Sequence, residues 1–220
     1  MTAEFWEQPE IVGRFAARDP DHRLLGLVSR MATPARVRIL DLGCAGGRNT
    51  EFLVRRGVSV RAADASAGMV RATRNRMTPW WSETVAADRV RQCAMTAIDE
   101  QGWRPFDAVL ALGVLHCAAS REEWDAALDA LRRMIVPSGW VLVANHTPAF
   151  DPEGTGLTPV SGQPHLFDGS ASGRSFLVSG PVLDREFARH GFRPLAPTET
   201  IRVATESGRR ETVNALYRRL

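Results

Sequence analysis

Short apolar runs alternate with amphipathic stretches through the middle of the chain. Four runs have the length and composition of buried strands, and they cover residues 37–42, 58–63, 106–112 and 140–144. Between them, apolar residues recur at helical spacing over residues 49–56, 67–77 and 121–135. This repeated order of strand and helix predicts an α/β protein with a mostly parallel sheet and helices on both of its faces.

The chain changes character between residues 147 and 180, where prolines and glycines interrupt any regular pattern. A loop of this length inside a compact domain is typical of a lid, a binding loop or disorder. A helix over about residues 182–190 is predicted next, followed by strand-like segments at 198–204 and 211–217. Ser207 and Gly208 between these segments favour a hairpin, so we expect the sheet to end antiparallel.

Composition narrows the classes of function. All 28 basic residues are arginine, and they are spread along the chain against 25 acidic residues, which predicts no nucleic-acid partner. The absence of lysine excludes a Schiff-base lysine and a Walker nucleotide loop. Cys44, Cys93 and Cys117 lie far apart, so we expect no metal site, no disulfide framework and a cytoplasmic location. No apolar run reaches membrane-spanning length, so no membrane partner is expected.

A cluster of glycines follows the first predicted strand, in the stretch DLGCAGGRN that begins at Asp41. Gly43, Gly46 and Gly47 would let a ligand approach the backbone, and the helix that follows offers unpaired N–H groups to a polar ligand. The alternative is a purely structural turn, but such a turn rarely needs three glycines in five positions. The dinucleotide fingerprint GxGxxG has no match here, so the cluster predicts a different ligand.

The order Asp41-x-Gly43-x-Ala45-x-Gly47 resembles motif I of the class I S-adenosylmethionine (SAM)-dependent methyltransferases, with Ala45 in place of the middle glycine. The resemblance continues in order to about residue 145, with a weaker similarity to the tellurite-resistance and thiopurine methyltransferase branches. It implies SAM as the cofactor. It also implies a Rossmann-like, doubly wound, seven-stranded sheet that ends in an antiparallel C-terminal hairpin.

This resemblance implies a single domain over residues 1–220. Its expected parts are an N-terminal helical cap (residues 1–35) and a SAM-binding core (residues 36–146). A lid over the substrate (residues 147–180) and a C-terminal helix with antiparallel strands (residues 181–220) are expected to follow.

The resemblance also implies the cofactor contacts. Asp64 ends the second predicted strand, where the family's carboxylate accepts hydrogen bonds from both ribose hydroxyls; a helix-capping acid is the alternative. Ala94 or Met95 stands where the family has an acid for the adenine amino group, so adenine would be held by Met69, Met95 and backbone groups unless both methionines are core residues. The implied cofactor contacts lie around the first four strand ends: Asp41, Gly43, Cys44, Ala45, Gly47, Asp64, Ala65, Met69, Ala94, Met95 and Leu112.

His116 is the candidate general base, because it follows the fourth predicted strand by four residues, close to where the methyl group points in this family. Histidine titrates near neutral pH and can take a proton from a hydroxyl or ammonium group. A packing role is the alternative for His116, and His146 is the second candidate base. Phe5 and Trp6 in the leading segment and His165 in the lid are candidate substrate contacts.

The predicted function is methyl transfer from SAM to an oxygen, nitrogen or sulfur atom of a small-molecule metabolite. The alternatives are a SAM-binding regulatory or partner subunit without catalysis, and an RNA methyltransferase. The Trp80–Trp81 pair would line the pocket or form a dimer contact, which leaves a homodimer open.

Overall fold

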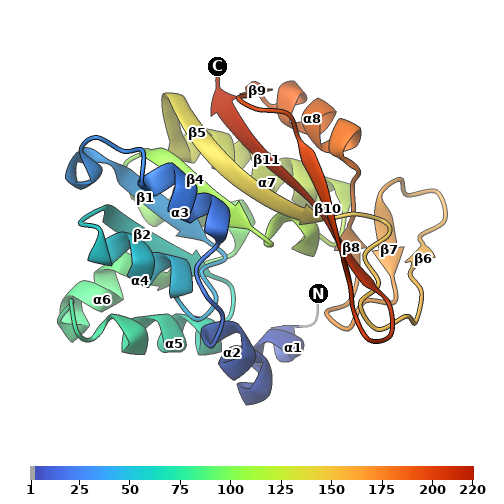
Figure 1. Cartoon of the computed structure of the whole chain (residues 1–220), viewed down its shortest axis with the longest axis horizontal. Helices are drawn as coiled ribbons and strands as arrows, with labels where there is room; N and C mark the ends of the chain where they lie inside the picture. Colours follow the sequence, from blue (N-terminus) through green and yellow to red (C-terminus); the bar gives the residue numbers. More distant parts are fainter. Residues whose placement is uncertain (1–2) are drawn as a thin grey trace.

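The computed structural model describes residues 3–220, and a twisted, mostly parallel sheet runs through its centre (Figure 1). The strand order is β10-β11-β5-β4-β1-β2-β3, and β9 adds an eighth strand by pairing with β11. Strands β1 to β5 are mutually parallel, whereas β11 runs antiparallel to β5, β9 and β10. The predicted α/β fold is confirmed, with β9 as an addition. The strands are β1 (Arg38–Leu42), β2 (Ser59–Asp64), β3 (Val90–Gln92), β4 (Phe106–Leu112), β5 (Ile135–His146), β9 (Phe192–Pro194), β10 (Glu199–Ala204) and β11 (Arg209–Arg219).

Helices cover both faces of the sheet because the strands bury apolar side chains on both sides. On one face, Leu131 and Phe187 of the helices α7 and α8 pack against strand residues such as Val141. On the other face, Leu24 and Leu53 of α3 and α4 pack with Val60 and Leu142. The helical elements of the core and C-terminal part are α3 (His22–Val28), η1 (Pro34–Arg36), α4 (Arg48–Arg55), α5 (Ala67–Met77), α6 (Glu83–Arg89), η2 (Met95–Gln101), η3 (Leu115–Cys117), α7 (Arg121–Met134) and α8 (Gly180–Arg189).

Helix α7 begins where the sequence predicts. The hydroxyl of Ser120 accepts a hydrogen bond from the amide of Glu123, and the Glu123 carboxylate accepts one from the Ala119 amide. The helix ends at Met134, and Ile135 already belongs to β5. The predicted strand 140–144 is therefore too short, because pairing with β4 and β11 extends β5 at both ends.

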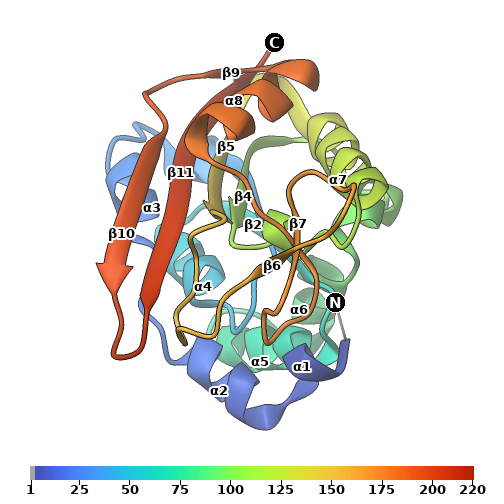
Figure 2. The ribbon, with the colours of Figure 1, turned by 90° about the vertical axis from the view of Figure 1, so that its right-hand side faces the viewer.

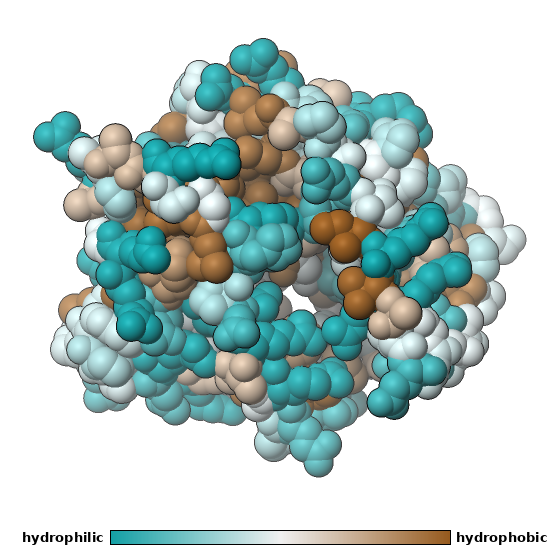
Figure 3. All heavy atoms as spheres, viewed as in Figure 1, coloured by the Kyte–Doolittle hydropathy of each residue, from teal (hydrophilic) through white to brown (hydrophobic). Residues whose placement is uncertain are grey.

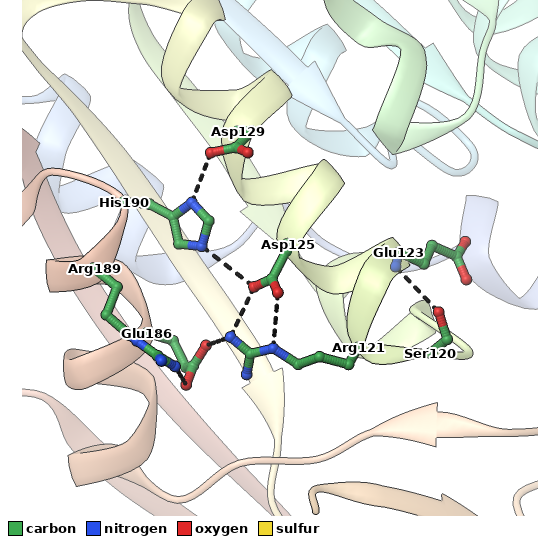
Figure 4. Close-up of polar contacts among 8 residues, drawn as sticks. All are labelled: Ser120, Arg121, Glu123, Asp125, Asp129, Glu186, Arg189 and His190. Atoms are coloured by element: carbon green, nitrogen blue, oxygen red, sulfur yellow. Dashed lines mark hydrogen bonds and ion pairs between the residues drawn. The ribbon is translucent and has the colours of Figure 1, made fainter. Parts of the chain in front are cut away.

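An ion-pair network joins α7 to α8 (Figure 4). Arg121 lies between two carboxylates and donates to Asp125 at 2.9 and 2.7 Å and to Glu186 at 2.6 Å. His190, just after α8, contacts Asp129 at 2.8 Å and Asp125 at 3.4 Å. The Glu186 side chain is only 7% exposed, so this network fixes α8 against α7 through a buried carboxylate.

The segment between β5 and α8 forms a small antiparallel sheet of its own, where the sequence suggested no regular element. Its strands are β6 (Thr158–Pro159), β7 (Leu166–Asp168) and β8 (Ser175–Phe176), in the order β6-β7-β8. Figure 2 shows this segment in front of the central sheet. The amide of Val178 donates to the carbonyl of His146, so the segment is attached directly at the end of β5.

The N-terminal helices α1 (Ala3–Glu7) and α2 (Pro9–Ala16) lie beside α5, below the carboxyl ends of the parallel strands (Figure 1). Gly46, in the loop after β1, lets the end of α2 lie against that loop, because a Cβ atom there would lie 2.4 Å from the Cα atom of Ala16. Figure 3 shows a hollow near the middle of the molecule. Among the residues that the structure describes, no helix is long and apolar enough to span a bilayer.

Candidate active site

The loop after β1 is built on left-handed backbone conformations. Gly43, Ala45 and Gly47 have φ angles of 73°, 50° and 78°. A Cβ atom on Gly43 would lie 2.7 Å from the Cβ atom of Val114, so glycine is needed there for both conformation and space. Ala45 adopts the left-handed region at a small strain cost, which an alanine tolerates better than a larger side chain. The loop thus turns sharply from β1 into α4.

Asp64 lies at the end of β2, directly beside this loop. Its carboxylate accepts hydrogen bonds from the amide of Ala45 at 2.9 Å and from the amide of Ser66 at 3.0 Å. Burial raises the pKa of Asp64 and the nearby charge of Glu7 adds to this, while the two amides oppose the rise. Each carboxylate oxygen keeps a free lone pair, so the group can accept further hydrogen bonds from a diol.

Asp41 and Cys44, two of the predicted cofactor contacts, have side chains that are buried beneath the glycine loop. Asp41 is 1% exposed and accepts a hydrogen bond of 2.6 Å from the hydroxyl of Thr50, which ties β1 to α4. Burial raises the pKa of Asp41 to about 6. The side chain of Cys44 packs in a small apolar cluster with Val70 and Val90. Only the backbone of Cys44 is therefore available to a ligand.

The predicted adenine contacts divide into exposed and buried residues. Ala65 and Ala94 follow β2 and β3, and both are exposed. Met69 and Met95 are buried, and Met95 belongs to the main core. Leu112, at the end of β4, is half-buried and packs against the core on the α3 side. The structure thus favours core packing for the methionines and leaves the two alanines at the surface of the site.

The two candidate bases stack face to face at the ends of β4 and β5. The rings of His116 and His146 have centroids 3.7 Å apart, and Phe150 stacks on the far side of His146 at 3.5 Å. Within residues 3–220 the buried Nδ1 atom of His116 has no hydrogen-bond partner. Burial lowers the pKa of His116 to about 4, and burial together with the charge on a protonated His116 lowers the pKa of His146. Both rings are therefore neutral at pH 7 and able to accept a proton.

The first helix closes over the start of α5, next to Asp64. The Ser66 hydroxyl donates to the carbonyl of Trp6 at 3.1 Å, and the carboxylate of Glu7 accepts from the Gly68 amide at 2.9 Å. The Trp6 ring lies between Phe5 and Phe15, with centroid distances of 4.9 and 5.4 Å. Sequence reasoning missed Glu7, because nothing in its sequence neighbourhood marks a contact with a residue 61 positions later.

His165 lies apart from the histidine pair. It has a φ angle of 70°, and its ring is 5.6 Å from that of Phe176. It faces a cavity of about 640 Å³ between β7 and the start of α7, whose lining includes Arg121 and Glu186. None of the predicted cofactor contacts lines that cavity. In residues 3–220 no three His, Cys, Asp or Glu side chains converge as metal ligands.

Comparison with known proteins identifies the central segment. Residues 40–141 match the family described as a methyltransferase domain. A ubiquinone biosynthesis O-methyltransferase from Caulobacter sp. (strain K31) is 29% identical over 113 residues, which are 49% of this chain and 40% of that protein. The chain thus spans less than half the length of this curated relative.

Solved structures share the fold. The CcbJ methyltransferase from Streptomyces caelestis superposes with a TM-score of 0.68 at 18% identity, over 98% of this chain and 97% of that one. A second structure is the Burkholderia thailandensis 1,6-didemethyltoxoflavin-N1-methyltransferase, solved with 1,6-didemethyltoxoflavin and S-adenosylhomocysteine. It superposes with a TM-score of 0.63 at 19% identity, over 96% of this chain and 79% of that one. The resemblance predicted from the glycine loop is confirmed by these findings.

Proposed function

Because residues 40–141 are a methyltransferase domain and the fold is that of class I SAM-dependent methyltransferases, we propose that the chain transfers a methyl group from SAM to a small-molecule metabolite. The acceptor atom is an oxygen, nitrogen or sulfur. The observation that carries this proposal is the contact between the glycine loop and the acid after β2, where the Ala45 amide meets the Asp64 carboxylate. Such a loop and acid at the carboxyl edge of a parallel sheet suit a nucleoside cofactor.

The residues present fit SAM. The free lone pairs of Asp64 suit the two ribose hydroxyls, and the left-handed turn at Gly43 and Gly47 brings backbone close to the methionine end. Ala65 and Ala94 expose backbone and small side chains where adenine would lie. When bound, SAM supplies an electrophilic methyl group on a sulfonium. Asp41 and Cys44 support this site from below.

The histidine pair serves proton transfer in this proposal. As the bond from the acceptor oxygen or nitrogen to the methyl carbon forms and the sulfur–methyl bond breaks, the acceptor's proton passes to His116 or His146. The low pKa of His116 keeps it unprotonated at neutral pH, so it is ready to accept. Stacking on His146, whose other face stacks on Phe150, holds the His116 ring in position. An acceptor that is already an anion would need no base.

The leading segment and the lid complete the proposed site. Phe5 and Trp6 cover the cofactor from α1, and residues 147–180 close over the acceptor. We place the four parts of the chain, 1–35, 36–146, 147–180 and 181–220, in one domain with this single active site. The three cysteines are free and buried, which suits a reducing cytoplasm.

A SAM-binding subunit without catalysis is the second candidate, because Ala45 and Ala94 both depart from the family's pattern. Calorimetry with SAM and S-adenosylhomocysteine tests binding, and turnover of a panel of hydroxylated, amine and thiol metabolites tests catalysis. We expect binding of both cofactor forms and turnover of at least one acceptor. Tight binding with no turnover across the panel would favour the second candidate, and no binding at all would end both.

A further inference from the structure

The end of β5 carries a polar side chain inside the apolar core. Asn145 is fully buried, with 0% of its surface exposed. Side chains alternate along a strand, so it lies on the same face of the sheet as Val141 and Val143, and it is opposite Val213 of β11. These three valines belong to the core that α7 and α8 cover. A fourth apolar residue would continue that core, so packing alone does not account for an amide here.

The amide of Asn145 ties the β8 segment to the backbone of His146. Its Nδ2 atom donates to the carbonyl of Phe176 in β8 at 3.2 Å and to the carbonyl of His146 at 3.1 Å. The same His146 carbonyl accepts a hydrogen bond of 3.2 Å from the amide of Val178. Both partners of the side chain are acceptors, so only the nitrogen end of the amide fits between them. Residues 176–178 are thereby bonded to the last residue of β5.

The oxygen end of the same amide is left without a partner. Within residues 3–220 the buried Oδ1 atom of Asn145 accepts no hydrogen bond. Burying a polar atom without a partner destabilises a fold, and such an atom in a native protein calls for an explanation. The chain thus keeps the donor end of Asn145 although the acceptor end is unfavourable. This favours a role for the link between β8 and His146.

His146 is also held from its other sides. Its ring lies between the rings of His116 and Phe150, with centroid distances of 3.7 and 3.5 Å. The next residue, Thr147, is 1% exposed, and its hydroxyl donates to the carboxylate of Glu211 in β11 at 2.7 Å. Buried polar side chains on both sides of His146 therefore fix its backbone, one toward β11 and the other toward β8.

We propose that Asn145 is a positioning residue for methyl transfer, which couples the docking of β8 to the placement of the His146 ring. This inference rests on the proposed function and adds a residue that acts through the histidine pair. Without the Asn145 amide, β8 is no longer tied to the end of β5, and the His146 carbonyl keeps only the Val178 amide as a donor. The ring can then shift within the stack. A displacement of about 1 Å at a proton acceptor is enough to slow the step that it serves.

Two variants and a matched control test the link. Asn145→Leu removes both hydrogen bonds at similar volume, and Asn145→Thr keeps one donor on a β-branched side chain that suits a strand. Asn214→Leu is the control. Asn214 is a buried asparagine in the neighbouring strand β11, 8% exposed, whose side chain accepts from Arg23 of α3 on the opposite face of the sheet. Its loss removes an equivalent amide without removing a bond to β8.

Three measurements are made on the full-length protein saturated with S-adenosylhomocysteine or, for turnover, with SAM and the acceptor that the metabolite panel identifies. Steady-state kinetics give kcat and KM, and hydrogen exchange follows the Leu177 and Val178 amides. The ring protons of His146 lie in the ring currents of His116 and Phe150, so their NMR shifts report the stack.

Asn145→Leu should lower kcat about 10- to 100-fold while KM and SAM affinity stay near parental, because the base is displaced and the binding contacts are not. The Val178 amide should exchange faster, and the His146 ring protons should move toward the shifts of an unstacked histidine. Asn145→Thr should show the same changes to a smaller extent. Asn214→Leu should match the parent in kcat and in the His146 shifts, whatever its melting temperature.

The outcomes separate this inference from the proposed function. Parental kcat and parental His146 shifts in both Asn145 variants would refute the positioning role, and a lowered melting temperature alone would then assign Asn145 to core stability. Asn145→Thr decides if Asn145→Leu does not melt cooperatively. If the parent turns over no acceptor or does not bind S-adenosylhomocysteine, it is the proposed function that fails. Displaced His146 shifts in the Asn145 variants would still support the coupling to β8, and unchanged shifts would refute it.

Discussion

The backbone amide of Ala45 donates a 2.9 Å hydrogen bond to the carboxylate of Asp64, and this contact joins the glycine loop after β1 to the end of β2. The parallel pairing of the two strands sets it up, because Leu42 lies opposite Ala63 and both strands end at the same edge. The carboxylate is thereby held in one orientation by the loop that it serves. The glycine loop and the Asp64 carboxylate are therefore in position before a ligand binds.

Replacing Asp64 with alanine should weaken SAM binding by roughly 1.5–3 kcal/mol, or about 10- to 150-fold, because charge-assisted hydrogen bonds to the ribose are lost. Calorimetric titration with SAM measures the effect. Asp88→Ala is the matched control, since Asp88 is exposed and, within residues 3–220, its ion-pair partners are Arg61 and Arg91. Equal affinity in all three proteins would show that Asp64 does not hold the cofactor.

Gly43 is a less direct test than Asp64. A valine there would lose binding if the loop contacts SAM, but it would also collide with Val114 and strain a left-handed backbone. Loss of binding in Gly43→Val counts only if the variant melts cooperatively near the parental temperature.

Replacing His116 with alanine should lower turnover about 10²- to 10⁴-fold for an acceptor whose proton must leave, with SAM affinity unchanged. The sequence alone suggested a histidine that titrates near neutral pH. Burial instead lowers its pKa to about 4, so the acidic limb of the parental pH–rate profile should lie near pH 4 and disappear in the variant. Full activity with the limb retained would assign packing to His116 and make His146 the next residue to test.

Hydrophobic patterning predicted the buried core of the fold because its strands are continuous apolar runs. The strands β6, β7 and β8 escaped prediction because they are two or three residues long and pair mainly through backbone groups. The glycine loop and Asp64 were visible as a motif. Glu7 was not, since tertiary packing alone brings its carboxylate to the amide of Gly68, and no spacing rule relates the two residues.

Hydrogen exchange should divide the segment that covers the site into two parts. Residues 153–156 and 161–163 are exposed, so their amides should exchange much faster than those of β1 and β4. Phe176, Leu177 and Val178 are buried, and Leu177 and Val178 donate to the carbonyls of His165 and His146. We expect these amides to be protected even without ligand. Uniform protection through residues 147–178 would contradict the idea of a mobile lid.

Replacing Arg121 with methionine should destabilise the fold by about 1–3 kcal/mol, because the buried carboxylate of Glu186 loses its main hydrogen-bond donor. Arg189, at 3.4 Å and 67% exposed, compensates only weakly. Chemical denaturation at pH 7 measures the loss. Arg174→Met is the control, because both side chains of its pair with Asp168 are exposed, so that water screens the pair and its loss should hardly change the stability.

The stability lost in Arg121→Met should depend on pH. Burial on its own would raise the pKa of Glu186, but the hydrogen bond and charge of Arg121 outweigh it, and the net pKa is lowered. A carboxyl group whose pKa is lower in the folded state stabilises the fold fully above its unfolded pKa of about 4.3. That contribution is lost as pH falls through the folded value. The stability difference between the parent and Arg121→Met should therefore be constant from pH 6 to 8 and shrink below about pH 4. A difference that persists undiminished in acid would mean that Arg121 stabilises α7 and α8 by packing of its aliphatic stem and not by charge.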